Sequence, residues 1–138
     1  MSRIVVGVDG STSSTAALRW AIQQAKLTGS EVEAITAWRV PAAYGIAPAG
    51  DGMADFEGDA KELLAKVLAE VGELETDVTI RSSVAEGDPG YVLADAARGA
   101  DLLVVGSRPD SGFAGVIGSD SQHCVRHAPC PVLVMRNC

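Results

Sequence analysis

Short apolar runs alternate with stretches of helical periodicity along the whole chain. Residues 4–8 (IVVGV) form one continuous apolar run, which is typical of a strand buried on both faces of a sheet. Apolar residues then recur at positions 18, 21, 22 and 25, a spacing that indicates one face of a helix. Because this change of period recurs to the end of the chain, the pattern predicts the order β-α-β-α-β-α-β-α-β.

Turn-forming and capping residues help to place the boundaries of these elements. The Ser-rich segment 11–13 can cap the first helix, Gly29 can end it, and Pro89 suits the first turn of a later helix. The predicted strands cover residues 4–8, 31–38, 77–84, 102–105 and 132–135, and the apolar helix faces lie within 18–25, 60–71, 92–97 and 121–128. The inner face of the last helix is predicted to consist of Ser121, Cys124, Val125 and Ala128. The stretch 41–58 is predicted to be irregular, as either a lid or a disordered insert.

The order of elements predicts an α/β fold. We expect one domain over residues 1–138, with a single doubly wound sheet of five mainly parallel strands and helices on both faces. Ligands of such sheets bind at the carboxyl ends of the strands, where the strand order reverses. Asp9, residues 37–38 and Gly106 follow or end predicted strands, so they are expected to gather around one crevice.

Composition excludes several classes of partner. The chain has 138 residues, of which 47% are hydrophobic, and its formal net charge is −7. A general nucleic-acid binder or a protein of anionic membrane surfaces needs a surplus of Lys and Arg, so we expect neither nucleic acid nor membrane as a partner. The N-terminus lacks the long apolar run of a signal peptide, and three cysteines without a CxxC pair favour a reducing, cytoplasmic location.

The segment 106–119 carries the strongest functional signal. Four glycines lie in it, between a predicted buried strand and a predicted helix that starts at Ser119. Glycines let backbone N–H groups approach a ligand closely, and a helix N-terminus attracts anions, so the segment could cradle a phosphate. The alternative is a strand-to-helix turn in which Ser119 only caps the helix. Neither GxxxxGK[ST] nor a properly placed GxGxxG occurs here.

Several motifs together resemble those of the universal stress protein family, and the resemblance spans essentially the whole chain. They are VGVDGS at 6–11, VVGSR at 104–108, GFAG at 112–115, GSDSQH at 118–123 and HAPCPVLV at 127–134. The resemblance implies an adenine-nucleotide-hydrolase-like fold that is usually dimeric and often binds ATP. It also implies that Asp9 binds the ribose or the adenine amino group and that the backbone at Ala37 holds the adenine edge. From the residues alone, Asp9 could instead form an Asx-turn or a cap for residues 11–13, and Ala37 could be a plain core residue. The candidate residues for ATP or another adenine nucleotide are Asp9, Ala37, Gly106, Arg108, Gly115, Gly118, Ser119 and Asp120.

The glycine segment departs from the pattern of the nucleotide-binding members, which resembles G-x2-G-x9-G-[S/T]. Pro109 stands where the second glycine is expected, and the spacing from there to Gly118 is one residue short. Proline has no N–H to offer a phosphate, and the carboxylates of Asp110 and Asp120 would compete with one. Within the nucleotide-binding hypothesis these changes favour a ligand with fewer phosphates. The alternative is a dimer that does not bind ATP and acts through protein partners.

The remaining predictions concern assembly and catalysis. The apolar last strand would be prone to aggregation if its edge stayed unpaired, which predicts a homodimer through Val132, Leu133, Val134 and Met135. No GxSxG motif occurs, and we predict no catalytic residue, although Asp9 could support a weak ATPase. His123 and His127 have metal-ligand spacing. Without a third ligand in view, the pair favours a surface or interface face of the last helix, and no metal is predicted.

Overall fold

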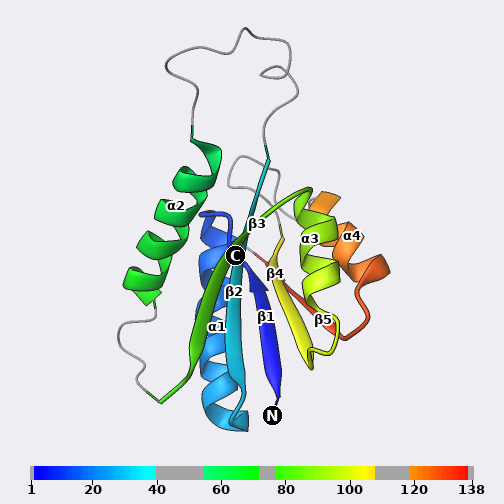
Figure 1. Ribbon diagram of the computed structural model, residues 1–138. Coiled ribbons are helices and arrows are strands. Elements are labelled where there is room, and N and C mark those ends of the chain that lie inside the picture. Colours follow the sequence, from blue (N-terminus) through cyan, green and yellow to red (C-terminus); the bar gives the residue numbers. More distant parts are fainter. Residues whose placement is uncertain (1, 40–54, 72–76, 108–118, 137–138) are drawn as a thin grey trace, which may run out of the picture.

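The computed structural model describes residues 2–39, 55–71, 77–107 and 119–136. Within these ranges the chain forms one five-stranded sheet in the order β3-β2-β1-β4-β5, and every neighbouring pair is parallel (Figure 1). The elements are β1 (Arg3–Gly7), α1 (Thr12–Thr28), β2 (Glu31–Trp38), α2 (Phe56–Val71), β3 (Ile80–Glu86), α3 (Pro89–Ala96), β4 (Leu102–Gly106), α4 (Ser119–His127) and β5 (Val132–Met135). The predicted α/β fold with a doubly wound parallel sheet is confirmed.

The helices lie on both faces of the sheet and divide the core in two. Helices α1 and α2 cover one face through a cluster that includes Leu18, Val67 and Val104, and α3 and α4 cover the other through a cluster that includes Leu93 and Cys124. The central strands β1 and β4 are fully buried in their middle residues. Their continuous apolar runs are therefore explained by burial on both faces.

Capping residues fix the ends of α1 where the sequence places them. The Ser11 side chain accepts a hydrogen bond from the N–H of Ser14 at 3.2 Å, which satisfies one of the free donors of the first turn. At the other end Gly29 is left-handed, with φ of 72°, and its N–H donates to the carbonyl of Ala25 at 2.8 Å. A residue with a side chain would be strained in that conformation.

Three local predictions need correction. Strand β3 covers Ile80–Glu86 and not 77–84, because it pairs with β2 from Val32 to Trp38. Helix α2 already begins at Phe56, where the Asp55 carboxylate accepts a hydrogen bond from Gly58 N–H at 2.9 Å. The rest of the predicted irregular stretch, 41–54, lies outside the described residues.

The third correction concerns the inner face of α4. The sequence assigned Val125 to that face, but its side chain is 54% exposed. Cys124 is the residue that packs inward, with its Sγ 3.9 Å from the carbonyl oxygen of Gly90 in α3. Neighbouring positions on a helix point about 100° apart, so a helix seated on Cys124 turns Val125 outward.

Candidate functional site

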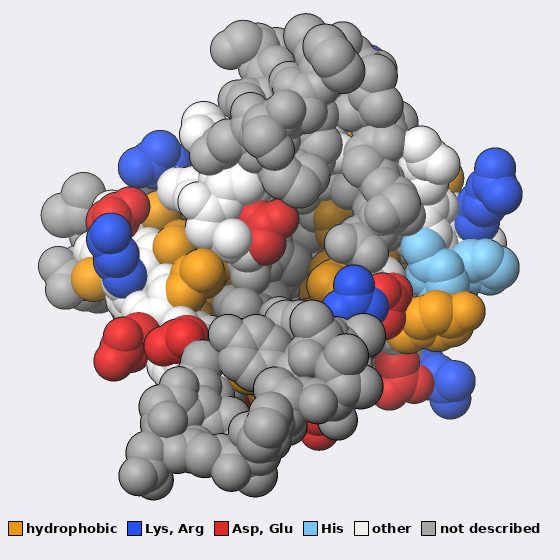
Figure 2. Space-filling model, turned by 90° about the horizontal axis from the view of Figure 1, so that it is seen from above, with side chains coloured by type: hydrophobic (Ala, Val, Ile, Leu, Met, Phe, Trp, Pro, Cys, Tyr) orange, Lys and Arg blue, Asp and Glu red, His pale blue; other side chains and the backbone are white. Residues whose placement is uncertain are grey.

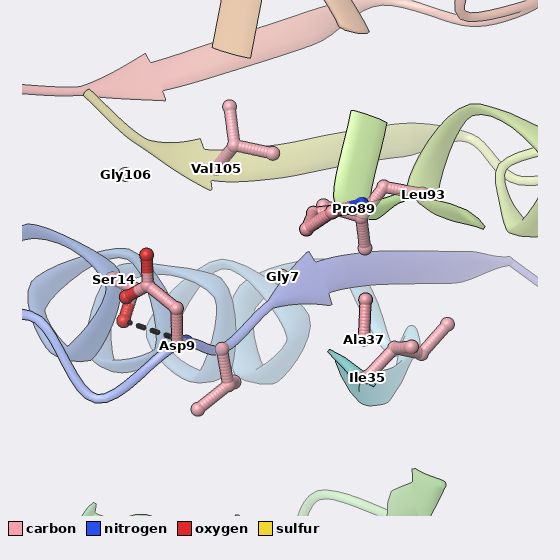
Figure 3. Close-up of a pocket in the computed structure, with 10 residues that line it drawn as sticks. Gly7, Asp9, Ser14, Ile35, Ala37, Pro89, Leu93, Val105 and Gly106 are labelled. Atoms are coloured by element: carbon pink, nitrogen blue, oxygen red, sulfur yellow. Dashed lines mark hydrogen bonds between the residues drawn. The ribbon is translucent and has the colours of Figure 1, made fainter. Parts of the chain in front are cut away.

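A cavity of about 100 Å³ lies at the carboxyl ends of the central strands (Figure 3). It sits where β1 has β2 on one side and β4 on the other, which is the point where the strand order reverses. Parallel sheets bind their ligands at this position. The lining residues come from β1 and the loop after it, β2, β4, the first turn of α1 and the first two turns of α3: Gly7, Val8, Asp9, Ser14, Ile35, Ala37, Pro89, Leu93, Val105 and Gly106.

One wall of the cavity is aliphatic and depends on a close approach of the Leu93 side chain, from α3, to Gly7 of β1. A Cβ atom at Gly7 would lie 2.6 Å from Cδ1 of Leu93, so only glycine lets the leucine reach this depth undisturbed. Pro89, at the start of α3, lies beside Leu93 and faces Ala37 and Ile35 across the cavity (Figure 3). The result is a narrow slot between apolar side chains, a shape that suits a flat ring system.

The backbone of Ala37 adds a donor and an acceptor to this slot. The carbonyl of Ile35 accepts from Val8 N–H at 2.9 Å, whereas the carbonyl of Trp38 accepts from Gly87 N–H at 2.8 Å. Because backbone groups alternate in direction along a strand, Ala37 N–H and C=O point toward β1. Strand β1 ends its pairing at Gly7 opposite Ile35, so no β1 residue is in register with Ala37. These two groups therefore face the cavity without a strand partner on that side.

Asp9 supplies the carboxylate of the cavity and also closes a local turn. Its Oδ1 accepts from Ser11 N–H at 2.9 Å, and its own N–H donates to the Ser14 hydroxyl at 3.2 Å (Figure 3). The first contact is the Asx-turn that the sequence left open as an alternative role. Asp9 is exposed, and the turn engages only Oδ1. One carboxylate can thus cap the turn with one oxygen and offer the other to a ligand.

Gly106 also lines the cavity, but packing explains why this position is glycine. A Cβ atom there would lie 2.6 Å from the Ser13 hydroxyl oxygen and 2.7 Å from the backbone nitrogen of Ser14. Both atoms belong to the first turn of α1, which crosses the end of β4 at this point. The glycine that the sequence attributes to a phosphate cradle is thus already required by the contact between β4 and α1.

The predicted site residues fall into two groups. Asp9, Ala37 and Gly106 come together around the cavity. The structure gives only the backbone of Ser119 and Asp120, at the start of α4. The predictions for Arg108, Gly115 and Gly118, like the departures at Pro109 and Asp110, lie outside the described residues.

Sequence reasoning missed most of the cavity wall. It did not assign Gly7, Ser14, Ile35, Pro89, Leu93 or Val105 to the site. For Pro89 and Leu93 the sequence does contain a signal of a helix, because they follow a Gly-Asp turn at a helix start. A helix start and an apolar helix face, however, do not reveal which strand end the helix covers.

Other reactive groups of the described chain lie away from this cavity. Burial raises the pKa of the Cys130 thiol, partly offset by the nearby Arg3 guanidinium, so the thiol is not activated. The described residues contain no group of three or more His, Cys, Asp and Glu side chains that could hold a metal ion. Nor does any helix in the described ranges have the length and apolar character needed to span a membrane.

The model of the Universal stress protein family matches residues 1–136. The chain belongs to this family. A universal stress protein of Mycolicibacterium smegmatis is 34% identical over 134 residues, a match that covers 96% of this chain and 45% of that protein. A universal stress protein of Mycobacterium tuberculosis is 34% identical over 138 residues, a match that covers 96% of this chain and 44% of that protein. The chain therefore spans about half the length of these curated relatives.

Solved members of the family share the fold. A universal stress protein crystallised in complex with cAMP is 26% identical, with a TM-score of 0.65 over 99% of this chain and 98% of that one. The family assignment itself rests on the sequence match. The structural similarity shows in addition that a relative with the same fold over its whole length binds an adenine nucleotide, cAMP.

Proposed function

We propose that this protein is a cytoplasmic, adenine-nucleotide-binding regulatory protein of the stress response, which takes ATP, ADP or AMP in the cavity at the β1–β4 switch point. The observation that carries the proposal is the slot itself, which combines aliphatic walls, the backbone groups of Ala37 and the carboxylate of Asp9. The family relative that was solved with cAMP supports the adenine class of ligand.

Each part of the slot matches one part of an adenine nucleoside. Leu93 and Pro89 face Ile35 across a gap that can hold the flat base by dispersion and burial of apolar surface. Adenine presents both a donor and an acceptor along one edge, and Ala37 offers the complementary C=O and N–H. Asp9 can accept hydrogen bonds from ribose hydroxyl groups. The phosphates would extend toward Arg108, Gly115, Gly118, Ser119 and Asp120, which remain predictions.

We propose a binding role and not a catalytic one. Among the described residues that line the cavity, Asp9 is the only ionisable side chain, and one of its oxygens already accepts from Ser11. A catalyst of phosphoryl transfer would need further groups that orient a nucleophile and neutralise charge. Release of phosphate from ATP at the same rate by wild type and by Asp9→Asn would agree with this assignment.

Removal of the Asp9 carboxylate is expected to weaken nucleotide binding by about 10- to 100-fold, the size of a lost hydrogen bond to a charged group. The measurement is isothermal titration calorimetry with AMP, ADP, ATP and cAMP, on wild type and on Asp9→Ala. Asp9→Asn is the matched control for the turn, because its side-chain oxygen still accepts from Ser11 N–H. Asn should keep wild-type thermal stability and still lose affinity.

The nucleotide panel also decides between the two functional hypotheses. Binding of AMP or ADP without ATP would agree with a phosphate segment that suits fewer phosphates. If wild type binds none of the four at millimolar concentration, the nucleotide proposal is wrong, and a protein that acts only through partners replaces it.

We further propose that the protein forms a homodimer through the edge of β5. All four residues of this strand are only half-buried, and no strand covers its outer edge in the described chain. The carbonyl of Pro131 accepts from Leu103 N–H at 2.9 Å, so by alternation Leu133 faces β4 whereas Val132 and Val134 direct their backbone groups outward. An outward row of donors and acceptors beside apolar side chains is suited to pairing with a second copy.

Val134→Pro is expected to convert the dimer to a monomer, because proline removes an outward N–H while the bonds from β5 to β4 remain. Sedimentation velocity at micromolar concentration measures the change. Val134→Ala, which keeps the N–H, should stay dimeric or dissociate only partly. A wild-type protein that sediments as a monomer would rule out the dimer, and a dimeric Val134→Pro would place the interface elsewhere.

A further inference from the structure

A second surface feature, separate from the cavity, lies between α3 and α4. Tyr91 and Asp95 of α3 and His123 and His127 of α4 line a groove there, together with Arg98 and Pro129. None of these residues lines the cavity at the strand ends. Figure 2 shows the two histidines side by side at the surface.

The two imidazole rings pack against each other in a tilted arrangement, and Tyr91 packs against one of them. His123 and His127 are one helical turn apart, and their ring centroids are 4.4 Å apart with a tilt of 36°. Tyr91 lies on the other side of His123, with a centroid distance of 4.3 Å. Positions i and i+4 share a helix face, so both side chains can reach one ion from the same side of α4.

Close packing between α3 and α4 fixes the position of the His123 ring. A Cβ atom at Gly90 would lie 2.9 Å from Cβ, 3.0 Å from Cγ and 3.1 Å from Cδ2 of His123. The carbon side of the ring therefore lies against the backbone of α3, and neither nitrogen is among the atoms nearest to Gly90. This packing restricts the ring before any ligand arrives, which lowers the entropy cost of binding.

The polar neighbours leave the imidazoles available. Asp95 forms an ion pair with Arg98 at 3.2 Å within the same groove. Over the described ranges of the chain, neither His123 nor His127 takes part in a hydrogen bond or an ion pair. Within those ranges, the rings in contact with them are each other's and that of Tyr91, which contacts His123. Within the described part of the chain, no hydrogen bond or ion pair therefore competes with a ligand for half-buried His123 or exposed His127.

We propose that His123 and His127 together bind a divalent transition-metal ion, of the class Cu²⁺, Ni²⁺ or Zn²⁺. Imidazole nitrogen suits these ions, and the Irving–Williams order places Cu²⁺ first among them. The net charge of −7 favours a cation. Because no third His, Cys, Asp or Glu of the described chain joins the pair, water completes the coordination and the ion exchanges readily. Such a site responds to metal concentration and does not hold a structural ion.

Calorimetric titration of the untagged protein with NiCl₂ tests the site. We expect one Ni²⁺ per chain, and a loss of affinity of about tenfold or more in His127→Ala, since even supporting changes around metal ligands cost this much. His127 is exposed, so this variant should keep the circular dichroism and melting curve of wild type. Arg126→Ala, the exposed neighbour on the same helix, is the matched control and should bind as wild type does.

Two further variants make the result decisive. His123→Ala should lose Ni²⁺ to the same extent as His127→Ala, and the electron paramagnetic resonance spectrum of the Cu²⁺ complex should show two nitrogen ligands in wild type. Cys130→Ser should leave Ni²⁺ binding unchanged. Wild-type affinity in His127→Ala, loss of binding in Cys130→Ser, or no binding to wild type at millimolar Ni²⁺ would each overturn the proposal.

Discussion

Gly106→Val is expected to lower the free energy of unfolding by about 3 kcal/mol, the upper range for overpacking a tight contact. For a chain of this size the melting temperature should fall by about 10 °C. The cause is steric. Any Cβ at position 106 meets the Ser13 hydroxyl at 2.6 Å, Ser14 N at 2.7 Å and the carbonyl carbon of Ser13 at 2.9 Å. Two of these atoms are backbone, so relief requires a shift of α1 against β4.

Such a shift also disturbs the capping of α1. Ser14 N–H donates to the Ser11 hydroxyl at 3.2 Å, and the Ser14 hydroxyl receives the N–H of Asp9 at 3.2 Å. A backbone movement at Ser14 therefore acts on the Asp9 turn as well as on the helix. We expect weaker nucleotide binding in Gly106→Val even at a temperature where the variant is fully folded.

Gly58→Ala is the matched control for this variant. Its added Cβ would meet the carboxylate of exposed Asp55, the flexible side chain that accepts from Gly58 N–H at the start of α2. Rotation of this side chain relieves the contact at the cost of a cap worth about 1 kcal/mol, which the better helix propensity of alanine offsets by up to about 1 kcal/mol. Chemical denaturation should therefore show stability close to that of wild type for Gly58→Ala and a clear loss for Gly106→Val. Equal stability of Gly106→Val and wild type would show that α1 does not press on the end of β4.

The sequence predicts the fold well because each element carries its own physical signal. The apolar run at 4–8 indicates a strand buried on both faces, and the structure confirms it as the sheet centre. Gly29 ends α1 because only glycine adopts its backbone conformation without strain. The errors fall where a neighbour decides the boundary. Strand β3 takes its length from pairing with β2, and no pattern inside residues 77–86 records that partner.

The candidate site is less predictable, because it depends on where elements cross. Asp9 and Ala37 follow from strand ends alone, since all parallel strands end at one edge of the sheet. The Leu93 side chain reaches the cavity undisturbed only because Gly7 of β1 has no Cβ, and these two positions lie far apart in the sequence. Gly106 shows a second difficulty. The sequence suggests that this glycine serves a phosphate site, whereas the structure shows that the contact between β4 and α1 already requires a glycine there.

Ala37→Leu is expected to reduce nucleotide affinity at least about tenfold while leaving the protein as stable as wild type, or more so. The leucine adds three carbon atoms to a cavity of about 100 Å³, so it occupies the place of the base. The same atoms would bury apolar surface against Ile35 and Pro89, at about 0.8 kcal/mol for each added methylene. Loss of binding together with gained stability separates occlusion of the slot from unfolding.

Ala85→Leu tests whether the effect belongs to the slot. Ala85 pairs directly with Ala37 in the neighbouring strand, is also half-buried, and does not line the cavity. The two variants therefore make the same chemical change one strand apart. Calorimetry with the tightest-binding nucleotide should give wild-type affinity for Ala85→Leu and a loss for Ala37→Leu. If Ala37→Leu binds as tightly as wild type, the base does not enter between Ala37 and α3, and the nucleotide, if bound, lies elsewhere on the protein.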